Sequence, residues 1–171
     1  MSQQRLVYIG SFTKDAGGEG TGISLARQDI ETGALELEGV VAETSSPAFL
    51  AWSPDGSRLY AINEVPEASV VAYSVEPGTG ALTPLGERQP TGGRGACHLT
   101  VHPSGRYVLT ANYGSGHISV HPVNADGSVG ERTDLVLHRG SGPNASRQEG
   151  PHAHHVRVDP SGKQVLAVDL G

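Results

Sequence analysis

The sequence is poor in cysteine, aromatic side chains and long apolar runs, and these absences exclude several classes of protein. Cys97 is the one cysteine among 171 residues, so the chain cannot form an internal disulfide framework, and we expect a reducing, cytoplasmic location. The apolar run at residues 6–9 is too short for a signal peptide or a membrane span. The net charge of -6 leaves no basic stripe, so we expect neither a membrane nor a nucleic acid as a partner.

Turn-forming residues are abundant instead. The 24 glycines and 11 prolines argue against long helices and for many tight turns. One pattern occurs three times: an apolar strand, a Pro-x-Gly turn and a second apolar strand that closes on Asn or Asp. The three turns begin at Pro54, Pro103 and Pro160, and the second strands close on Asn63, Asn112 and Asp169.

A second turn signal interleaves with the first, at Gly33, Gly80 and Gly127. Together the two signals define a unit of about fifty residues with four short strands, which is the size of a propeller blade. A complete β-sandwich is the alternative, but a sandwich does not require the same turn and the same closing residue at fixed offsets. The repeat therefore predicts an all-β protein with β-propeller architecture.

The repeat also predicts how the blades divide the chain. We expect one partial propeller domain over residues 1–171, an open fragment of about three blades, each of four antiparallel strands. Its parts are a first blade without its innermost strand at 6–42, a second blade at 48–89, a third at 97–137 and the start of a fourth at 154–171. We expect this chain to be the front portion of a longer protein whose later blades close the ring.

In such a blade the innermost strand begins, and the second strand ends, at the mouth of the central channel. This geometry brings side chains from distant parts of the sequence to one concave rim, where propellers tend to place their sites. The candidates that follow the second strands are Asn63, Glu64, Asn112, Tyr113 and Asp169. The candidates at or before the innermost strands are Arg94, His98, Arg147 and Gln148.

The histidines around the last innermost strand are the sharpest chemical signal. His152 and His154 alternate along an expected strand, so they point to one face, where two imidazoles could bind a metal or carry out acid–base chemistry near neutral pH. His155 occupies the position of Phe49 in the second blade, which favours a packing role. Cys97 begins an inner strand, which favours a packed residue over a nucleophile.

Two groups of candidates leave alternatives open. The recurring Asn63, Asn112 and Asp169 could hold the following loops through hydrogen bonds to the backbone, or could line the pocket with amide and carboxylate groups. Arg94 and Arg147 could bind a carboxylate, a phosphate or a developing oxyanion through their two-pronged guanidinium groups, or could be solvated loop residues.

Several segments resemble one known family. They are Val7-Tyr8-Ile9-Gly10-Ser11-Phe12-Thr13, Ala111-Asn112-Tyr113 and Arg147-Gln148-x-x-Pro151-His152-x-His154. In these residues the chain resembles the seven-bladed propeller lactonases, which include propeller-type 6-phosphogluconolactonases and the fungal carboxymuconate-lactonizing enzymes, the cycloisomerase 2 family. The resemblance runs from residue 6 to residue 171, and family members are about twice as long, so it covers their front half.

The resemblance implies hydrolysis of 6-phosphogluconolactone to 6-phosphogluconate in the oxidative pentose phosphate pathway, without a cofactor or an obligatory metal. The catalytic residues it implies are His152, His154 and Arg147, with one histidine as general base and the arginine stabilising the oxyanion. The substrate, a sugar lactone, would contact Arg94, His98, Asn63, Glu64, Asn112, Tyr113, Gln148 and Asp169.

Three other functions remain open at this stage. A muconate-type cycloisomerase would share the fold, and so would a calcium-dependent gluconolactonase, for which Glu64, Asn112 and Asp169 supply oxygen ligands. A non-catalytic propeller that binds a protein partner is the third. The polar, histidine-rich rim argues against it, because partner surfaces favour aromatic anchors.

Overall fold

The structure, a computed structural model, describes residues 4–171 as four antiparallel sheets. Sheet one contains β1 (Gln4–Gly10), β2 (Gly22–Asp29) and β3 (Leu35–Glu43). Sheet two contains β4 (Pro47–Trp52), β5 (Arg58–Asn63), β6 (Ser69–Val75) and β7 (Leu82–Pro90). Sheet three contains β8 (Ala96–Val101), β9 (Tyr107–Asn112), β10 (His117–Pro122) and β11 (Asp134–Leu137). Sheet four contains β12 (Ala153–Val158) and β13 (Val165–Asp169).

Two short 3₁₀ turns complete the secondary structure of the described residues: η1 (Lys14–Ala16) and η2 (Tyr113–Ser115). The predicted all-β class is therefore confirmed. Among residues 4–171, no helix has the length and apolar character that crossing a membrane requires.

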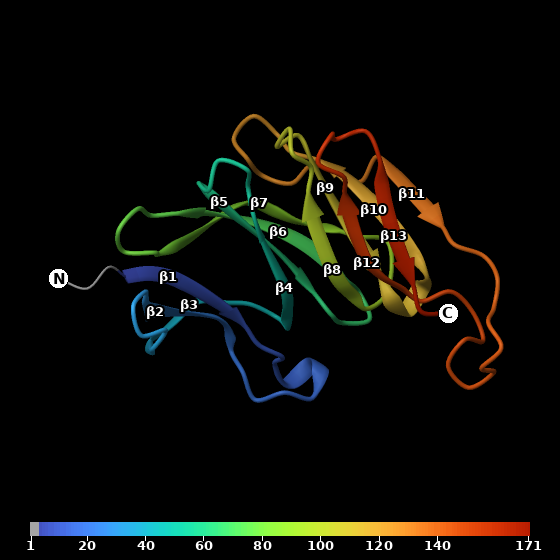
Figure 1. The fold of residues 1–171 in the computed structure, drawn as a ribbon, viewed down its shortest axis with the longest axis horizontal. Helices are drawn as coiled ribbons and strands as arrows, with labels where there is room; N and C mark the ends of the chain where they lie inside the picture. The colour runs from blue at the N-terminus through green and yellow to red at the C-terminus, as the bar shows by residue number, and fades with distance from the viewer. Residues whose placement is uncertain (1–3) are drawn as a thin grey trace.

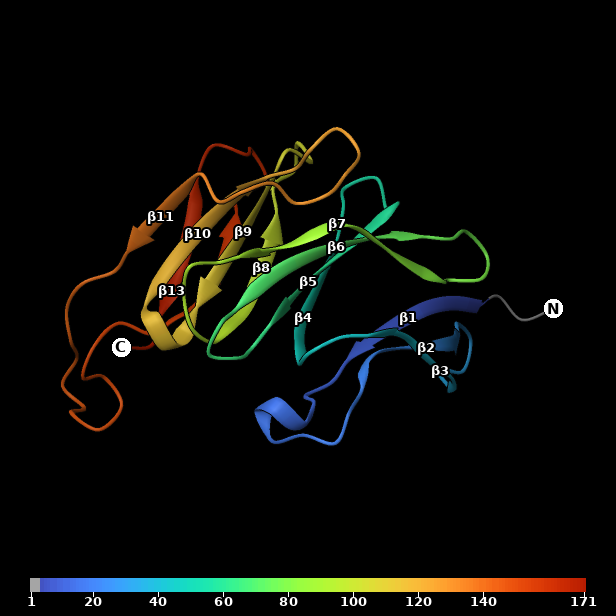
Figure 2. The ribbon, with the colours of Figure 1, turned by 180° about the vertical axis from the view of Figure 1, so that it is seen from behind.

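Sheets one, two and three follow one another from blue to orange (Figure 1), and sheet four, in red, overlaps sheet three both in this view and from behind (Figure 2). The strand β12 packs against β8 and β9, which places sheet four on sheet three. Each sheet packs its face against the next. In β5, Tyr60 and Ile62 face sheet three, while Ala61 belongs to the cluster shared with sheet one. Because both faces of β5 are covered, residues 59–63 of this strand are all buried, as expected for a strand inside a stack.

The Pro-x-Gly turns form for a local reason. Gly56, Gly105 and Gly162 have φ angles of 70°, 69° and 70°, in the left-handed region that glycine enters at no steric cost. Each turn is closed by a backbone hydrogen bond of 2.9 Å across the hairpin, from Ser53, His102 and Asp159 respectively.

A β-bulge interrupts the pairing of the first strand in sheets two, three and four. In sheet four, Ala153 pairs with Asp169 but His155 pairs with Val168, so His154 is the extra residue. The same shift in the other two sheets makes Ala48 and Cys97 the extra residues. A bulge turns a side chain away from its regular direction and is frequent beside active sites. The three bulges therefore mark one equivalent position at the beginning of each of these strands.

Candidate functional site

The candidate site lies where β5, β9 and β13 end and β4, β8 and β12 begin; we call this region the mouth. The first strands of sheets two, three and four are neighbours, which brings the three bulges together. The turn η2, the loop before β12 and the C-terminus lie at the lower right in Figure 1. The mouth therefore collects residues more than a hundred positions apart in the sequence.

Tyr113 lies at the centre of the site. Its ring stacks on His152, with centroids 4.5 Å apart and planes inclined by 18°, and meets the edge of His154 at 6.1 Å. Its hydroxyl lies 3.5 Å from Nη2 of Arg147. The Tyr113 backbone is fixed in turn, because its N–H donates to the carbonyl of Gly95 at 2.8 Å. One aromatic ring thus joins all three predicted catalytic side chains.

Both ring nitrogens of His152 have partners. Nδ1 lies 3.1 Å from the Tyr113 carbonyl oxygen and Nε2 lies 3.2 Å from Oε1 of Glu149. Each ring nitrogen therefore faces an oxygen of the protein. The His152 side chain is only 16% exposed. His152 is therefore held in place, with both ring nitrogens engaged inside the protein.

His154 differs from His152 in this respect. It occupies the bulge of β12, its side chain is exposed, and within residues 4–171 its ring makes no hydrogen bond. The Glu64 carboxyl lies close enough for an electrostatic interaction with it. An unengaged imidazole beside a carboxylate can accept a proton from water and keep it near neutral pH.

The two groups beside His154 are partly desolvated. Burial raises the pKa of the Glu64 carboxyl, and the positive charge of His154 partly opposes this effect. Burial also raises the pKa of the Cys97 thiol to about 11, with a further contribution from the Glu64 charge. Cys97 Sγ lies 3.4 Å from the His154 carbonyl oxygen. The thiol is therefore protonated at neutral pH, which agrees with a packed residue.

One residue after the bulge in β4, β8 and β12, three rings from successive sheets form a column. His98 lies between Phe49 at 4.1 Å and His155 at 3.8 Å, measured between centroids. Burial, followed by the charges of His155 and His154, lowers the pKa of His98 to about 4. The column borders a hollow of about 310 Å³ that also contains Trp52 and Arg157. His98 therefore contributes a neutral ring to the channel wall.

The recurring amides are engaged within the fold. The Asn63 side-chain oxygen accepts hydrogen bonds from the backbone N–H and hydroxyl of Ser69 at 2.6 and 3.1 Å. Asn112 is fully buried; its oxygen accepts from Thr91 at 2.7 Å, and its nitrogen donates to Thr110 at 3.2 Å. These contacts favour the loop-holding alternative for both residues.

Asp169 is engaged in the same way. Its Oδ1 accepts hydrogen bonds from the backbone N–H groups of His152 and Gly171 at 2.7 and 2.8 Å, and its Oδ2 lies 2.5 Å from Nδ1 of His138. Burial alone would raise the pKa of this carboxyl, but these three hydrogen bonds outweigh burial and lower it. Asp169 therefore stays ionised and holds the entry to β12.

The two candidate arginines meet at η2. Nη2 of Arg94 donates to the carbonyl of Gly114 at 2.7 Å, one residue after the ring that Arg147 approaches. Both arginines are exposed, so their other N–H groups can bind an anion. Gln148 instead closes its own loop, because its side-chain oxygen accepts from the Asn144 N–H at 3.1 Å.

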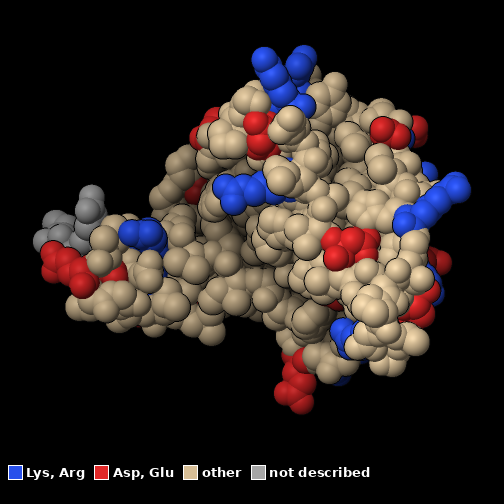
Figure 3. Space-filling model, turned by 45° about the vertical axis from the view of Figure 1, so that its right-hand side comes forward, with Lys and Arg blue, Asp and Glu red and all other residues tan. Residues whose placement is uncertain are grey.

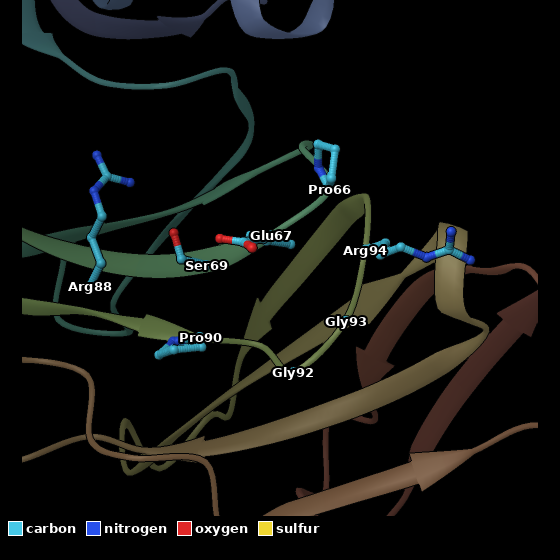
Figure 4. Close-up of a pocket in the computed structure, with 9 residues that line it drawn as sticks. Pro66, Glu67, Ser69, Arg88, Pro90, Gly92, Gly93 and Arg94 are labelled. Atoms are coloured by element: carbon cyan, nitrogen blue, oxygen red, sulfur yellow. The ribbon is translucent and has the colours of Figure 1, made fainter.

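A hollow of about 520 Å³ lies on sheet two next to this arginine pair. Figure 4 shows Ser69 at the start of β6 and Glu67 in the loop before it, while the guanidinium of Arg94 points away toward η2. Arg88 stands at the other side of the hollow and bonds to the Thr44 hydroxyl. Arg94 lines the hollow, but its guanidinium is bonded to the Gly114 carbonyl in η2.

Of the predicted site residues, the structure brings Glu64, Tyr113, Arg147, His152 and His154 together, with Arg94 at the edge. Sequence reasoning missed Glu149, which holds His152, and His138, which holds Asp169. Only Glu149 left a signal, since it lies three residues before His152. Within residues 4–171, no group of three or more His, Cys, Asp and Glu side chains could hold a metal ion.

Comparison with known proteins identifies the family. Residues 6–171 match the model of the family described as lactonase, 7-bladed β-propeller. The chain belongs to this family. The resemblance found in the sequence and the β-propeller fold class are both confirmed.

Two named relatives agree with this assignment. The chain is 36% identical to 6-phosphogluconolactonase of Bacillus subtilis over 96% of its own length and 46% of the relative. It is 26% identical to 6-phosphogluconolactonase of Formosa agariphila over 96% of its length and 47% of the relative. The chain thus spans about half the length of the curated relatives it matches.

Solved lactonase-family structures resemble the fold closely. A Bacteroides fragilis protein superposes with a TM-score of 0.90 at 36% identity, covering 98% of this chain and 46% of the other. The periplasmic gluconolactonase of Pseudomonas aeruginosa superposes with a TM-score of 0.91 at 27% identity, covering 99% of this chain and 48% of the other.

Proposed function

We propose that the protein hydrolyses a sugar lactone, and within this class 6-phosphogluconolactone, to the open-chain acid. One observation carries the proposal: the unengaged imidazole of His154 stands at a bulge, in contact with Tyr113, whose hydroxyl neighbours Arg147. The 6-phosphogluconolactonase activity named for two relatives supports it.

In the proposed reaction, His154 takes a proton from water as the water oxygen attacks the lactone carbonyl carbon. Arg147 donates hydrogen bonds to the oxyanion that forms. Collapse of this intermediate breaks the bond between the carbonyl carbon and the ring oxygen. The ring oxygen then takes the proton from His154 and becomes a hydroxyl group. Glu64 stabilises the imidazolium between the two proton transfers.

The assignment of substrate within the lactones rests on Arg94. A phosphate at the far end of the lactone would meet the free N–H groups of Arg94, while Arg147 serves the carbonyl. Unphosphorylated gluconolactone is the second candidate, favoured by the similarity to the Pseudomonas aeruginosa protein. A calcium-dependent reaction gains no such support, since the oxygens of Asn112 and Asp169 are used inside the fold.

Steady-state hydrolysis of both lactones by the whole protein tests this function. We expect His154→Ala to lower kcat by about 10²–10⁴-fold, the usual contribution of a general base. Arg94→Gln should raise KM for the phosphorylated lactone and leave KM for gluconolactone unchanged. His102→Ala, at the opposite end of the sheets, is the control and should keep wild-type kinetics. Wild-type rates in His154→Ala would refute the assignment.

Location is part of the proposal as well. The single cysteine supports a cytoplasmic protein, while a similar solved protein is periplasmic. Cell fractionation decides between the two compartments.

A further inference from the structure

A closed circuit of hydrogen bonds joins sheet three to sheet four beside the candidate site. The His138 N–H donates to the Gly116 carbonyl at 3.0 Å, and His138 Nδ1 lies 2.5 Å from Asp169 Oδ2. The other carboxylate oxygen of Asp169 accepts from the His152 N–H at 2.7 Å. The His152 ring then returns to the Tyr113 carbonyl at 3.1 Å, three residues before Gly116.

The circuit fixes His152, two residues before the His154 bulge. His152 is tied to η2 by its ring and to β13 by its N–H, and its carbonyl accepts a hydrogen bond from the Leu170 N–H at 3.0 Å. His155 is tied by its ring contact with His98. Gly116 is also in close contact with this segment, because a Cβ added there would lie 2.5 Å from the Pro151 carbonyl oxygen.

His138 is the member of the circuit that comes from outside the mouth. It directly follows β11, the outermost strand of sheet three, and its side chain is only 21% exposed. Oδ1 of Asp169 also accepts from the Gly171 N–H at 2.8 Å, so without His138 the carboxylate would be held at one oxygen only and could rotate about it. A hydrogen bond at Oδ2 holds the carboxylate plane and so directs Oδ1 at the His152 N–H.

We infer that His138 and Asp169 are positioning residues: together they hold the beginning of β12 against η2, so that His154 is presented beside Tyr113 and Arg147. The effect of these two residues on catalysis rests on the proposed function. Their effect on the position of β12 does not depend on it. A catalytic imidazole must be held within a fraction of an ångström of its productive position, and supporting hydrogen bonds supply that restraint.

The test compares three variants of this chain by amide hydrogen exchange and by ¹⁵N shifts of the His152 ring. His138→Phe keeps a planar side chain and removes the donor, whereas His138→Asn restores a donor near the position of Nδ1. His102→Phe is the matched control. His102 also joins sheet three to sheet four, through a contact of 3.0 Å with the Gly162 carbonyl, but at the far end of the sheets.

We expect His138→Phe to speed exchange of the His152 N–H by about tenfold or more, because a hydrogen bond to a charged group is worth at least that factor. The His152 ring shifts should move toward those of a solvated imidazole. His138→Asn should restore both signals, and His102→Phe should change neither. In the whole protein, His138→Phe should lower kcat for the lactone with little change in KM.

Unchanged His152 exchange in His138→Phe would overturn the inference. Equal loss of protection in His138→Phe and His102→Phe would also overturn it, since that result indicates general loosening of the two sheets. The exchange and shift measurements need no substrate, so failure of lactone hydrolysis would refute the proposed function and leave the positioning result standing.

Discussion

Cys97 and His154 occupy the same place in successive sheets, yet their surroundings give them different chemistry. Each is the extra residue of a bulge at the beginning of a first strand. The thiol is covered by the backbone of the next sheet, and burial raises its pKa to about 11. The His154 imidazole lies on β12, the first strand of sheet four, and is exposed. Position alone therefore does not assign a catalytic role.

The Cys97 environment predicts slow alkylation. With its pKa raised from 9.0 to about 11, the thiolate fraction near pH 8 falls about a hundredfold, and iodoacetamide reacts with the thiolate. We expect the folded chain to react about a hundredfold more slowly than the urea-unfolded chain, as followed by mass spectrometry. Equal rates in the two states would show that the thiol is not desolvated. In the whole protein, Cys97→Ala should keep lactone hydrolysis.

For single residues, the sequence predicts which side chains lie at the mouth, but it predicts less well which contacts those side chains make. Strand ends and strand starts can be aligned from the repeat, which brings Glu64, Tyr113 and His154 to one region. Whether a side chain faces the channel or a neighbouring loop depends on partners that the repeat does not encode. Asn112 finds its partner in Thr91, and Asp169 finds His138, both across loops without a common pattern.

Strands and turns follow from the sequence more directly than the bulges do. Apolar residues alternate between two covered faces, and each Pro-x-Gly turn places glycine where a positive φ is needed. The bulges leave no such signal, since Ala48, Cys97 and His154 share no chemical property. They are defined by pairing between strands, which a single repeat unit of sequence cannot specify.

The ring column across three first strands predicts a pH-dependent stability. His98 has a pKa of about 4 in the fold, chiefly because of burial, against about 6.5 when unfolded. As pH falls from 6.5 to 4, the unfolded chain binds a proton at His98 that the folded chain does not. The free energy of unfolding therefore decreases over this window, and the decrease ends below pH 4.

Urea unfolding at pH 7, 5.5 and 4.5 measures this effect. His98→Phe, which places the side chain of Phe49 at the equivalent position, should show a smaller loss of stability between pH 7 and 4.5 than the unchanged chain. Asp15, Asp55 and Asp159, whose pKa values lie at about 2 because side-chain hydroxyl groups donate hydrogen bonds to them, contribute mainly below this window. The same slope in both proteins would count against His98.

At the scale of the whole molecule, the main feature is that sheet four exposes apolar side chains to solvent. On β13, Val165, Leu166 and Val168 are 49%, 57% and 48% exposed. Charged groups of both signs are scattered over the face shown in Figure 3, with broad uncharged surface between them. Exposed apolar strands favour association. The repeat in the sequence predicts that successive sheets pack face to face. The number of blades in a closed ring is a property of the whole protein.

We expect this chain to associate as its concentration rises. Leu166→Lys should raise the dissociation constant at least about tenfold, because burial of one leucine side chain contributes more than that factor. Sedimentation velocity over a concentration series gives this constant. Gln164→Lys, which adds the same charge at an exposed position just before β13, should leave the constant nearly unchanged. A monomer at all concentrations would contradict the prediction.

The bulge repeated in three sheets separates folding from chemistry. Alanine, cysteine and histidine all occupy it, and the strand pairing shifts by one residue at the same place in each sheet. The pairing of the backbone therefore does not depend on which side chain stands at the bulge, and the side chain there can differ from sheet to sheet without a change of fold. Ala48 packs against the core shared by sheets two and three, so among these three bulges the exposed one, at His154, is the position open to a reactive group.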